Sequence, residues 1–156
     1  MDNNIYVSLN GKVLLEHKLK EIEKQIIETY RLMGESSKND NDLRENPEYN
    51  ELQNKVSYEL PLAKSRIKEI IRNCVIIENE KFYKNFDKQM VIIGCNVKIL
   101  FNNEVEIYQI VGYGEEDPFE GKIAYNCRLA STLIGKRINE EFLYQNNIIK
   151  IIDVWL

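Results

Sequence analysis

The sequence predicts an α+β protein, in which an antiparallel helical hairpin of the coiled-coil kind precedes a β-sheet domain with one short helix. In the first half, apolar residues recur at steps of three and four, the period of a helix that buries one face. In the second half, short β-branched runs alternate with turn-forming residues, which is the pattern of strands. The pattern changes near residues 75 to 80, so we expect a hairpin domain over residues 1–76 and a sheet domain over residues 80–156.

Two helices are expected in the hairpin domain. The first carries its apolar stripe from Leu15 to Met33 and should end near Gly34, where turn-forming residues replace the stripe. The second carries a similar stripe from Tyr49 to Cys74. Pro61 lies within this second helix and should kink it, because proline removes one backbone hydrogen bond and crowds the preceding turn. Two such stripes pack along a narrow seam, which places the tip of the hairpin at residues 41–49.

The sheet domain is predicted from its β-branched runs and its turns. The expected strands cover residues 75–77, 90–93, 96–101, 104–111, 122–125 and 148–154. Asparagine tolerates positive φ better than most residues, so Asn102–Asn103 and Asn146–Asn147 are predicted to be tight hairpin turns. The expected short helix covers residues 128–134 and ends at Gly135, because glycine is a common stop signal at a helix C-terminus.

The composition limits the classes of function. The chain has 156 residues, 44% of them hydrophobic, which is enough for folded cores, and a net charge of −4 that argues against holding duplex nucleic acid. No apolar run reaches the roughly 18 residues of a membrane span, and no signal peptide is recognisable, so we expect a cytoplasmic protein without a membrane partner. Three scattered cysteines predict free thiols, and His17 as the single histidine excludes sites that need several imidazoles.

The polar turn between the two helices is the most informative stretch. Asn46 is a good N-cap and Pro47 suits the first helical position, so the carboxylates of Asp42 and Glu45 lie just before a helix start. Two such acids can share a divalent cation such as Mg²⁺, but alone they rarely make a tight site. They could instead complete a partner's metal site, where a second ion activates water for attack on a phosphodiester. The simpler interpretation is that the helix dipole favours acids here.

Together with Ile110–Asp117 and Leu129–Lys136, this tip resembles the Gre family of bacterial transcript-cleavage factors, and the resemblance spans nearly the whole chain. It implies an FKBP-like sheet domain, similar in fold to FK506-binding prolyl isomerases. It also implies a hairpin that enters the secondary channel of a backtracked bacterial RNA polymerase, which then cuts its own transcript near the RNA 3′ end. Such a protein would be a monomer, no enzyme itself, with no cofactor beyond the Mg²⁺ of the polymerase.

The resemblance also implies roles for individual residues. The tip acids Asp42 and Glu45 would be the ligands of a Mg²⁺ ion shared with the polymerase. Tip support would come from Arg44, Asn46 and Tyr49, although Tyr49 lies on the apolar stripe and packing alone is an equal explanation for it. A second group of residues would dock the protein on the rim of the polymerase channel. These docking residues are Glu115, Asp117, Asn126, Cys127 and Arg128.

Several departures from the family pattern keep other functions open. Cys127–Arg128 stands where the family usually has Ser-Pro, and the interval from Tyr49 to Arg66 is longer by about one turn, or roughly four residues. The chain could therefore be a secondary-channel regulator that binds polymerase and inhibits or modulates it without stimulating cleavage. A structural or chaperone-like interaction module is a third possibility, since a fold alone licenses no activity.

Overall fold

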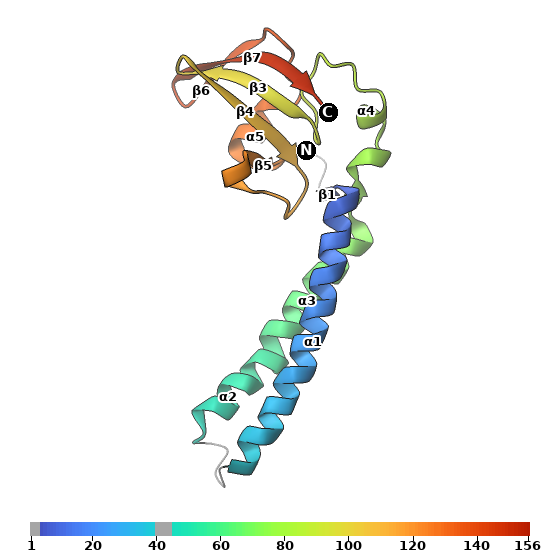
Figure 1. Cartoon of the computed structure of the whole chain (residues 1–156), viewed down its shortest axis with the longest axis vertical. Helices are drawn as coiled ribbons and strands as arrows, with labels where there is room; N and C mark the ends of the chain where they lie inside the picture. Colours follow the sequence, from blue (N-terminus) through green and yellow to red (C-terminus); the bar gives the residue numbers. More distant parts are fainter. Residues whose placement is uncertain (1–3, 40–44) are drawn as a thin grey trace. The chain divides into compact units, whose positions relative to one another are not determined.

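A computed structural model describes residues 4–39 and 45–156 of the chain. Its contacts divide the chain into two units (Figure 1). The hairpin unit is Val13–Asn73, and the sheet unit joins the N-terminal segment through Lys12 to Cys74–Leu156. This division differs from the expected one at the N-terminus, because β1 (Tyr6–Val7) pairs in parallel with β2 (Val75–Ile76) and so belongs with the sheet unit.

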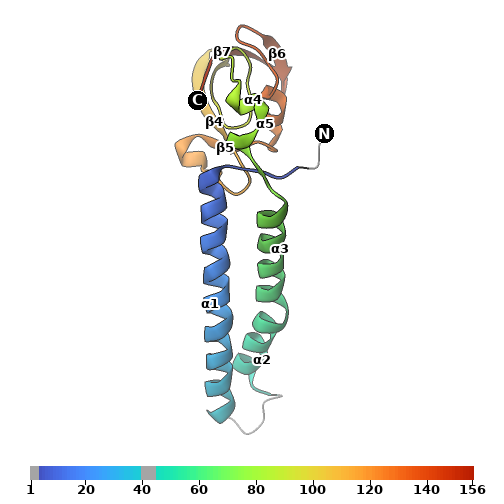
Figure 2. The ribbon, with the colours of Figure 1, turned by 90° about the vertical axis from the view of Figure 1, so that its right-hand side faces the viewer.

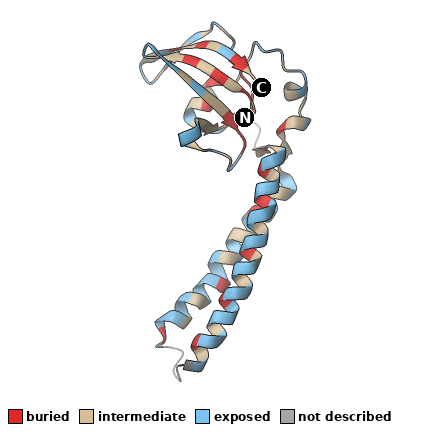
Figure 3. Cartoon of the chain, viewed as in Figure 1, coloured by how far each residue is buried: buried red, intermediate tan, exposed pale blue. Residues whose placement is uncertain are grey.

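The hairpin unit contains two antiparallel arms (Figure 2). The first arm is α1 (Leu9–Asn39), whose first turn lies in the sheet unit. The second arm consists of α2 (Pro47–Asn54), the π-helical turn η1 (Lys55–Glu59) and α3 (Leu60–Asn73). Both arms carry buried side chains from the predicted apolar stripes, and Figure 3 marks the buried positions in red. These buried side chains include Leu15, Ile22, Val56, Ile67 and Ile70.

The expected end of the first helix near Gly34 is wrong, since α1 continues to Asn39. Glycine in a helix interior costs about 1 kcal/mol relative to alanine, which a long, well-packed helix tolerates. Gly34 is exposed, and a Cβ at this position would meet no atom within 4 Å. The turn-forming residues after Gly34 therefore extend the helix instead of ending it.

The second arm accommodates Pro61 through η1, which directly precedes α3. The Leu60 N–H donates to the carbonyl of Lys55, five residues back. Pro61 has no N–H to offer the carbonyl of Ser57, so the regular four-residue ladder cannot continue through this point. A π turn shifts the hydrogen-bond register from four residues to five, so η1 carries the helix up to the proline.

The sheet unit is built on five strands in the order β5-β4-β3-β7-β6, and all neighbouring strands are antiparallel except β4 and β5. The strands are β3 (Asn96–Phe101), β4 (Glu104–Val111), β5 (Lys122–Ala124), β6 (Glu141–Tyr144) and β7 (Asn147–Trp155). The short helix α5 (Arg128–Leu133) packs on one face of this sheet, and three further single turns are η2 (Ile77–Asn79), α4 (Lys81–Lys84) and η3 (Pro118–Glu120). The predicted α+β class, with helical hairpin and sheet, is confirmed.

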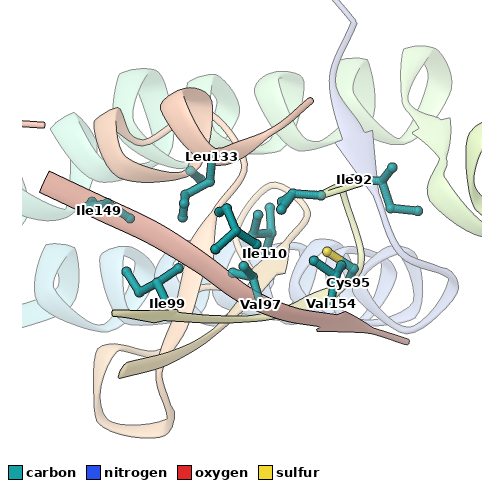
Figure 4. Close-up of a cluster of buried hydrophobic side chains, with 11 residues drawn as sticks. Ile92, Cys95, Val97, Ile99, Ile110, Leu133, Ile149 and Val154 are labelled. Atoms are coloured by element: carbon teal, nitrogen blue, oxygen red, sulfur yellow. The ribbon is translucent and has the colours of Figure 1, made fainter. Parts of the chain in front are cut away.

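The core of the sheet unit forms between α5 and the inner faces of the central strands. Ile99, Ile110, Leu133 and Ile149 are fully buried there, and their side chains point toward one another (Figure 4). Gly135 follows α5 with a φ of +86°, as expected for the predicted helix stop. Among the described residues, no helix is both long and apolar enough to cross a bilayer.

Two expectations for the strands are wrong. Residues 90–93 form no strand, although Val91, Ile92 and Ile93 are buried. The segment makes only one isolated antiparallel bridge, from Met90 to Arg137, beside which Val91 N–H donates to Lys136 O and its carbonyl accepts from Gly135 N–H. Strand β6 was not foreseen. The turn at Asn102–Asn103 is confirmed by φ values of 52° and 64°.

The second hairpin turn lies one residue earlier than expected. The positive φ values fall at Gln145 (48°) and Asn146 (66°), so Asn147 already belongs to β7.

Candidate functional site

The candidate site is the tip of the hairpin unit, at the start of α2. Asn46 is the N-cap of α2, with φ −84° and ψ 104°, and its Oδ1 accepts from the Tyr49 N–H at 3.0 Å. Pro47 occupies the first helical position, where its missing N–H costs nothing. The predicted helix start is thus confirmed. Of the residues proposed for the tip, Asp42 and Arg44 lie outside the described residues.

Glu45 stands immediately before this N-cap and is exposed. The unpaired N–H groups of a helix N-terminus carry partial positive charge, which favours a carboxylate nearby. Among the described residues, none donates a hydrogen bond to the Glu45 carboxylate. No described residue therefore competes with a ligand for its two oxygens.

A polar network beneath the tip was missed in the sequence. Ser36 Oγ lies 3.0 Å from Glu48 Oε2, and Asn46 Nδ2 lies 3.2 Å from Ser36 Oγ. The only available signal was an N-cap asparagine and a serine that could face it. The turn-forming residues after Gly34 hide that signal because they predict a helix end, whereas α1 carries Ser36 to the level of α2.

Tyr49 takes part in the tip through both its backbone and its side chain. Its backbone N–H completes the Asn46 cap, and its side chain is half-buried on the first turn of α2. Tyr49 therefore contributes to the helix start through its backbone N–H, whether its ring supports the tip or only packs along the apolar stripe.

Glu115 and Asp117 of the predicted docking group are both engaged within the sheet unit. The Glu115 carboxylate accepts from the backbone N–H of Ser8 at 3.0 Å and from the Ser8 hydroxyl, directly before α1. Asp117 Oδ1 accepts from the Phe119 N–H at 3.0 Å and so caps η3. Both carboxylates fix local backbone, and the neighbouring Phe119 side chain is fully exposed.

The other predicted docking residues share the turn that starts α5. Asn126 and Arg128 are exposed, whereas Cys127 is half-buried and acts as the N-cap, its Sγ 3.4 Å from the Ala130 nitrogen. The Arg128 carbonyl accepts from the hydroxyl of Thr132 at 2.9 Å. Cysteine thus supplies the capping acceptor here, and the arginine is presented outward on the first position of the helix.

In residues 4–39 and 45–156, no group of three or more His, Cys, Asp or Glu side chains could hold a metal ion. Glu45 offers the oxygen ligands that Mg²⁺ prefers, and its exposure leaves room for further ligands from elsewhere.

The chain thus belongs to the class of two-unit proteins that combine a helical hairpin with a small mixed sheet, and it carries an exposed acid directly before the N-cap of the second arm. The family model for the C-terminal part of the transcription elongation factors GreA and GreB matches residues 87–155. Transcription elongation factor GreA of Shouchella clausii is 33% identical over 141 residues, covering 86% of this chain and 84% of the relative. GreA of Geobacillus kaustophilus is 35% identical over 144 residues, with the same two coverages of 86% and 84%.

Among solved structures, the transcription factor Gfh1 aligns over 99% of both chains, with 14% identity and a TM-score of 0.45. The GreA factor homolog 1 (Gfh1) protein of Thermus thermophilus aligns over 99% of this chain and 100% of its own, with 14% identity and a TM-score of 0.42. The identity to the GreA relatives, which covers most of both chains, establishes that this chain belongs to the GreA/GreB family of transcription elongation factors.

Proposed function

We propose that this protein stimulates the intrinsic transcript cleavage of a backtracked bacterial RNA polymerase. Its hairpin enters the secondary channel of the polymerase, and the tip reaches the nascent RNA 3′ end at the active site. The observation that carries the proposal is the exposed Glu45, placed directly before a well-formed N-cap at the end of two packed arms. A factor of this kind works in the cytoplasm, where the polymerase is.

The chemistry follows from the carboxylates of the tip. Asp42 and Glu45 would supply oxygen ligands to a Mg²⁺ ion that the polymerase also binds, and the chemistry of such an ion would be activation of a water and stabilisation of charge on the phosphodiester. The roles of this chain are then to bring the two acids to the ion, to hold Glu45 at the helix start, and to exclude bulk water from the channel. Arg44 would contact the RNA or the polymerase, and Asn46 and Tyr49 would keep the tip backbone in place.

The sheet unit would dock the factor on the rim of the channel. Arg128 and Asn126 are the exposed members of the predicted docking group, and Cys127 holds the turn that presents them. Glu115 and Asp117 would act indirectly, because their carboxylates already accept hydrogen bonds from the chain's own backbone. We expect the factor to dock as a monomer and to supply no catalytic group that works without the polymerase.

A second proposed function is that of a regulator that occupies the channel without stimulating cleavage. It is favoured by Cys127–Arg128, which stands in place of the Ser-Pro usual in the family, and by the π turn in the second arm. A changed docking turn alters affinity for the rim, and a changed arm length alters the reach of the tip. If the acids then stop short of the active site, the protein would occupy the channel and modulate the polymerase without stimulating cleavage.

Transcript cleavage by a deliberately backtracked elongation complex from the same host tests the proposal. The wild type should shorten the transcript, and the double variant Asp42→Ala/Glu45→Ala should bind the polymerase without doing so. Glu51→Ala, which removes an exposed acid from α2 beyond the tip, serves as the matched control and should retain full stimulation.

Three results would contradict parts of the proposal. Cleavage by the double variant at the wild-type rate would exclude the tip acids. Binding without cleavage by the wild type would leave the channel-occupying regulator. Cleavage of free RNA by the purified factor with Mg²⁺ would show a nuclease independent of the polymerase.

A further inference from the structure

Buried polar side chains are rare in the hairpin unit, and two of them meet beneath the tip. In the described part of the chain, the buried polar residues are Thr29, Ser36 and Asn46, with exposed fractions of 7%, 4% and 8%. The hydroxyl of Thr29 donates to the Gln25 carbonyl within α1, so it involves one helix only. Ser36 and Asn46 instead bond to each other from opposite arms.

Ser36, Asn46 and Glu48 form a directed chain of hydrogen bonds, which we call the tip clamp. The Asn46 amide Nδ2 donates to Ser36 Oγ at 3.2 Å, and the Ser36 hydroxyl donates to Glu48 Oε2 at 3.0 Å. The other end of the same amide, Oδ1, accepts from the Tyr49 N–H at 3.0 Å. Ser36 must accept one hydrogen bond and donate another, which a hydroxyl can do and an aliphatic side chain cannot.

The tip clamp fixes the position of α2 against α1 more than it adds to the free energy of unfolding. A typical hydrogen bond adds about 0.5–1.5 kcal/mol net, and burying polar groups offsets part of that gain. Apolar side chains of similar size could close the seam at least as tightly. Directed bonds, however, permit one register and one orientation of α2 against the end of α1, because a slip of one residue would leave buried donors unpaired.

We propose that the tip clamp is a positioning device for the acidic tip: Ser36, Asn46 and Glu48 fix the backbone from which Glu45 reaches its ligand. This inference rests on the proposed function. Asn46 follows Glu45 directly, so a hydrogen bond that holds the Asn46 amide also limits the movement of the Glu45 backbone. A misplacement of about 1 Å in a reacting group can lower a rate by roughly 100-fold. A loose tip would therefore bind polymerase normally and stimulate cleavage poorly.

Ser36→Ala tests the proposal when cleavage is measured over a range of factor concentrations. The positioning role predicts a maximal cleavage rate lowered by about tenfold or more at saturating factor, with an unchanged half-saturating concentration. Ser37→Ala is the matched control, since the Ser37 hydroxyl bonds at 3.0 Å to the Gly34 carbonyl of its own helix. This control should leave both quantities at their wild-type values.

A pair of variants at Glu48 separates positioning from folding. Glu48→Gln keeps an acceptor for the Ser36 hydroxyl and should keep most of the maximal rate, whereas Glu48→Ala removes that acceptor and should lose it. Circular dichroism would verify that all variants keep the helical hairpin. If Ser36→Ala reduced helicity, the comparison of the two Glu48 variants would decide.

Several outcomes would overturn the proposal. A maximal rate for Ser36→Ala equal to that of Ser37→Ala would remove the positioning role, as would a change confined to the half-saturating concentration. Equal losses for Glu48→Gln and Glu48→Ala would exclude the hydrogen bond as the cause. A wild type without cleavage activity would refute the proposed function itself, and with it the role of the clamp.

Discussion

Replacing Glu115 should destabilise the sheet unit, although its sequence position suggested a docking residue. Its carboxylate accepts from the Ser8 N–H at 3.0 Å and from the Ser8 hydroxyl. Two glycines leave room for this carboxylate. A Cβ at Gly11 would lie 2.4 Å from the Glu115 Cδ, and one at Gly112 would lie 2.3 Å from its Oε2.

The size of the effect follows from the two hydrogen bonds that Glu115→Ala removes. A hydrogen bond to a charged group contributes about 1.5–3 kcal/mol, but Ser8 is half-buried and water recovers part of the loss. We therefore expect the free energy of unfolding to fall by about 2 kcal/mol in total. For a domain of 60–100 residues this corresponds to a decrease in Tm of roughly 10 °C. Glu115→Gln keeps one acceptor and should cost about half as much.

Trp155 provides the assay, since it is the single tryptophan and lies in β7 of the sheet unit. Its fluorescence during urea denaturation reports the unfolding of that unit. Glu116→Ala, which removes the exposed neighbouring acid, is the matched control. Equal unfolding midpoints for the Glu115 and Glu116 variants would refute the reasoning. Loss of polymerase binding by Glu115→Ala at unchanged stability would instead restore a direct docking role.

Three further predictions concern stability, titration and reactivity. Gly34→Ala should stabilise the hairpin by about 1 kcal/mol in thermal unfolding, because the exposed position leaves a Cβ free of contacts. The hydrogen bond from Lys64 and the charge of Lys64 lower the pKa of Glu23, so Lys64→Ala should raise that pKa in an NMR titration. The contribution of this pair to stability is lost as the pH falls through the lowered pKa of Glu23. Burial raises the pKa of the Cys95 thiol to about 11, so alkylation at neutral pH should require unfolding, and rapid native labelling would contradict the structure.

The sequence was informative wherever one local pattern determined the structure. The two apolar stripes predicted the helical arms, because apolar residues at steps of three and four fit one face of a helix and do not fit a strand. Asn46 followed by Pro47 predicted the start of α2, since both residues act through their own backbone. The turn at Asn102–Asn103 was predicted for the same reason, from the tolerance of asparagine for positive φ.

The sequence was misleading where the outcome depended on distant partners. Val91 and its apolar neighbours resemble a strand, but a short buried run has no distinguishing period, and its backbone pairs with Gly135 and Lys136 instead. Gly34 resembles a helix stop, yet the tertiary packing of α1 outweighs a propensity cost of about 1 kcal/mol. The pairing of β1 with β2 joins residues about 70 positions apart in sequence, and no local pattern indicates such a partner.

The acids discussed for the candidate site differ in whether the chain itself holds them by hydrogen bonds. This difference indicates which of them can bind a metal ion of a partner. Glu48 and Glu115 both lie in regions that a motif would mark as functional, but each accepts a hydrogen bond from a serine of its own unit. Each of these carboxylates keeps further lone pairs, but a movement toward a metal ion would stretch the bond that a half-buried or buried serine donates to it. Glu45 carries no such cost among the described residues, because it is exposed and none of them donates to its carboxylate. The acids held within the chain thus set local geometry, whereas Glu45 accepts no such bond from a described residue.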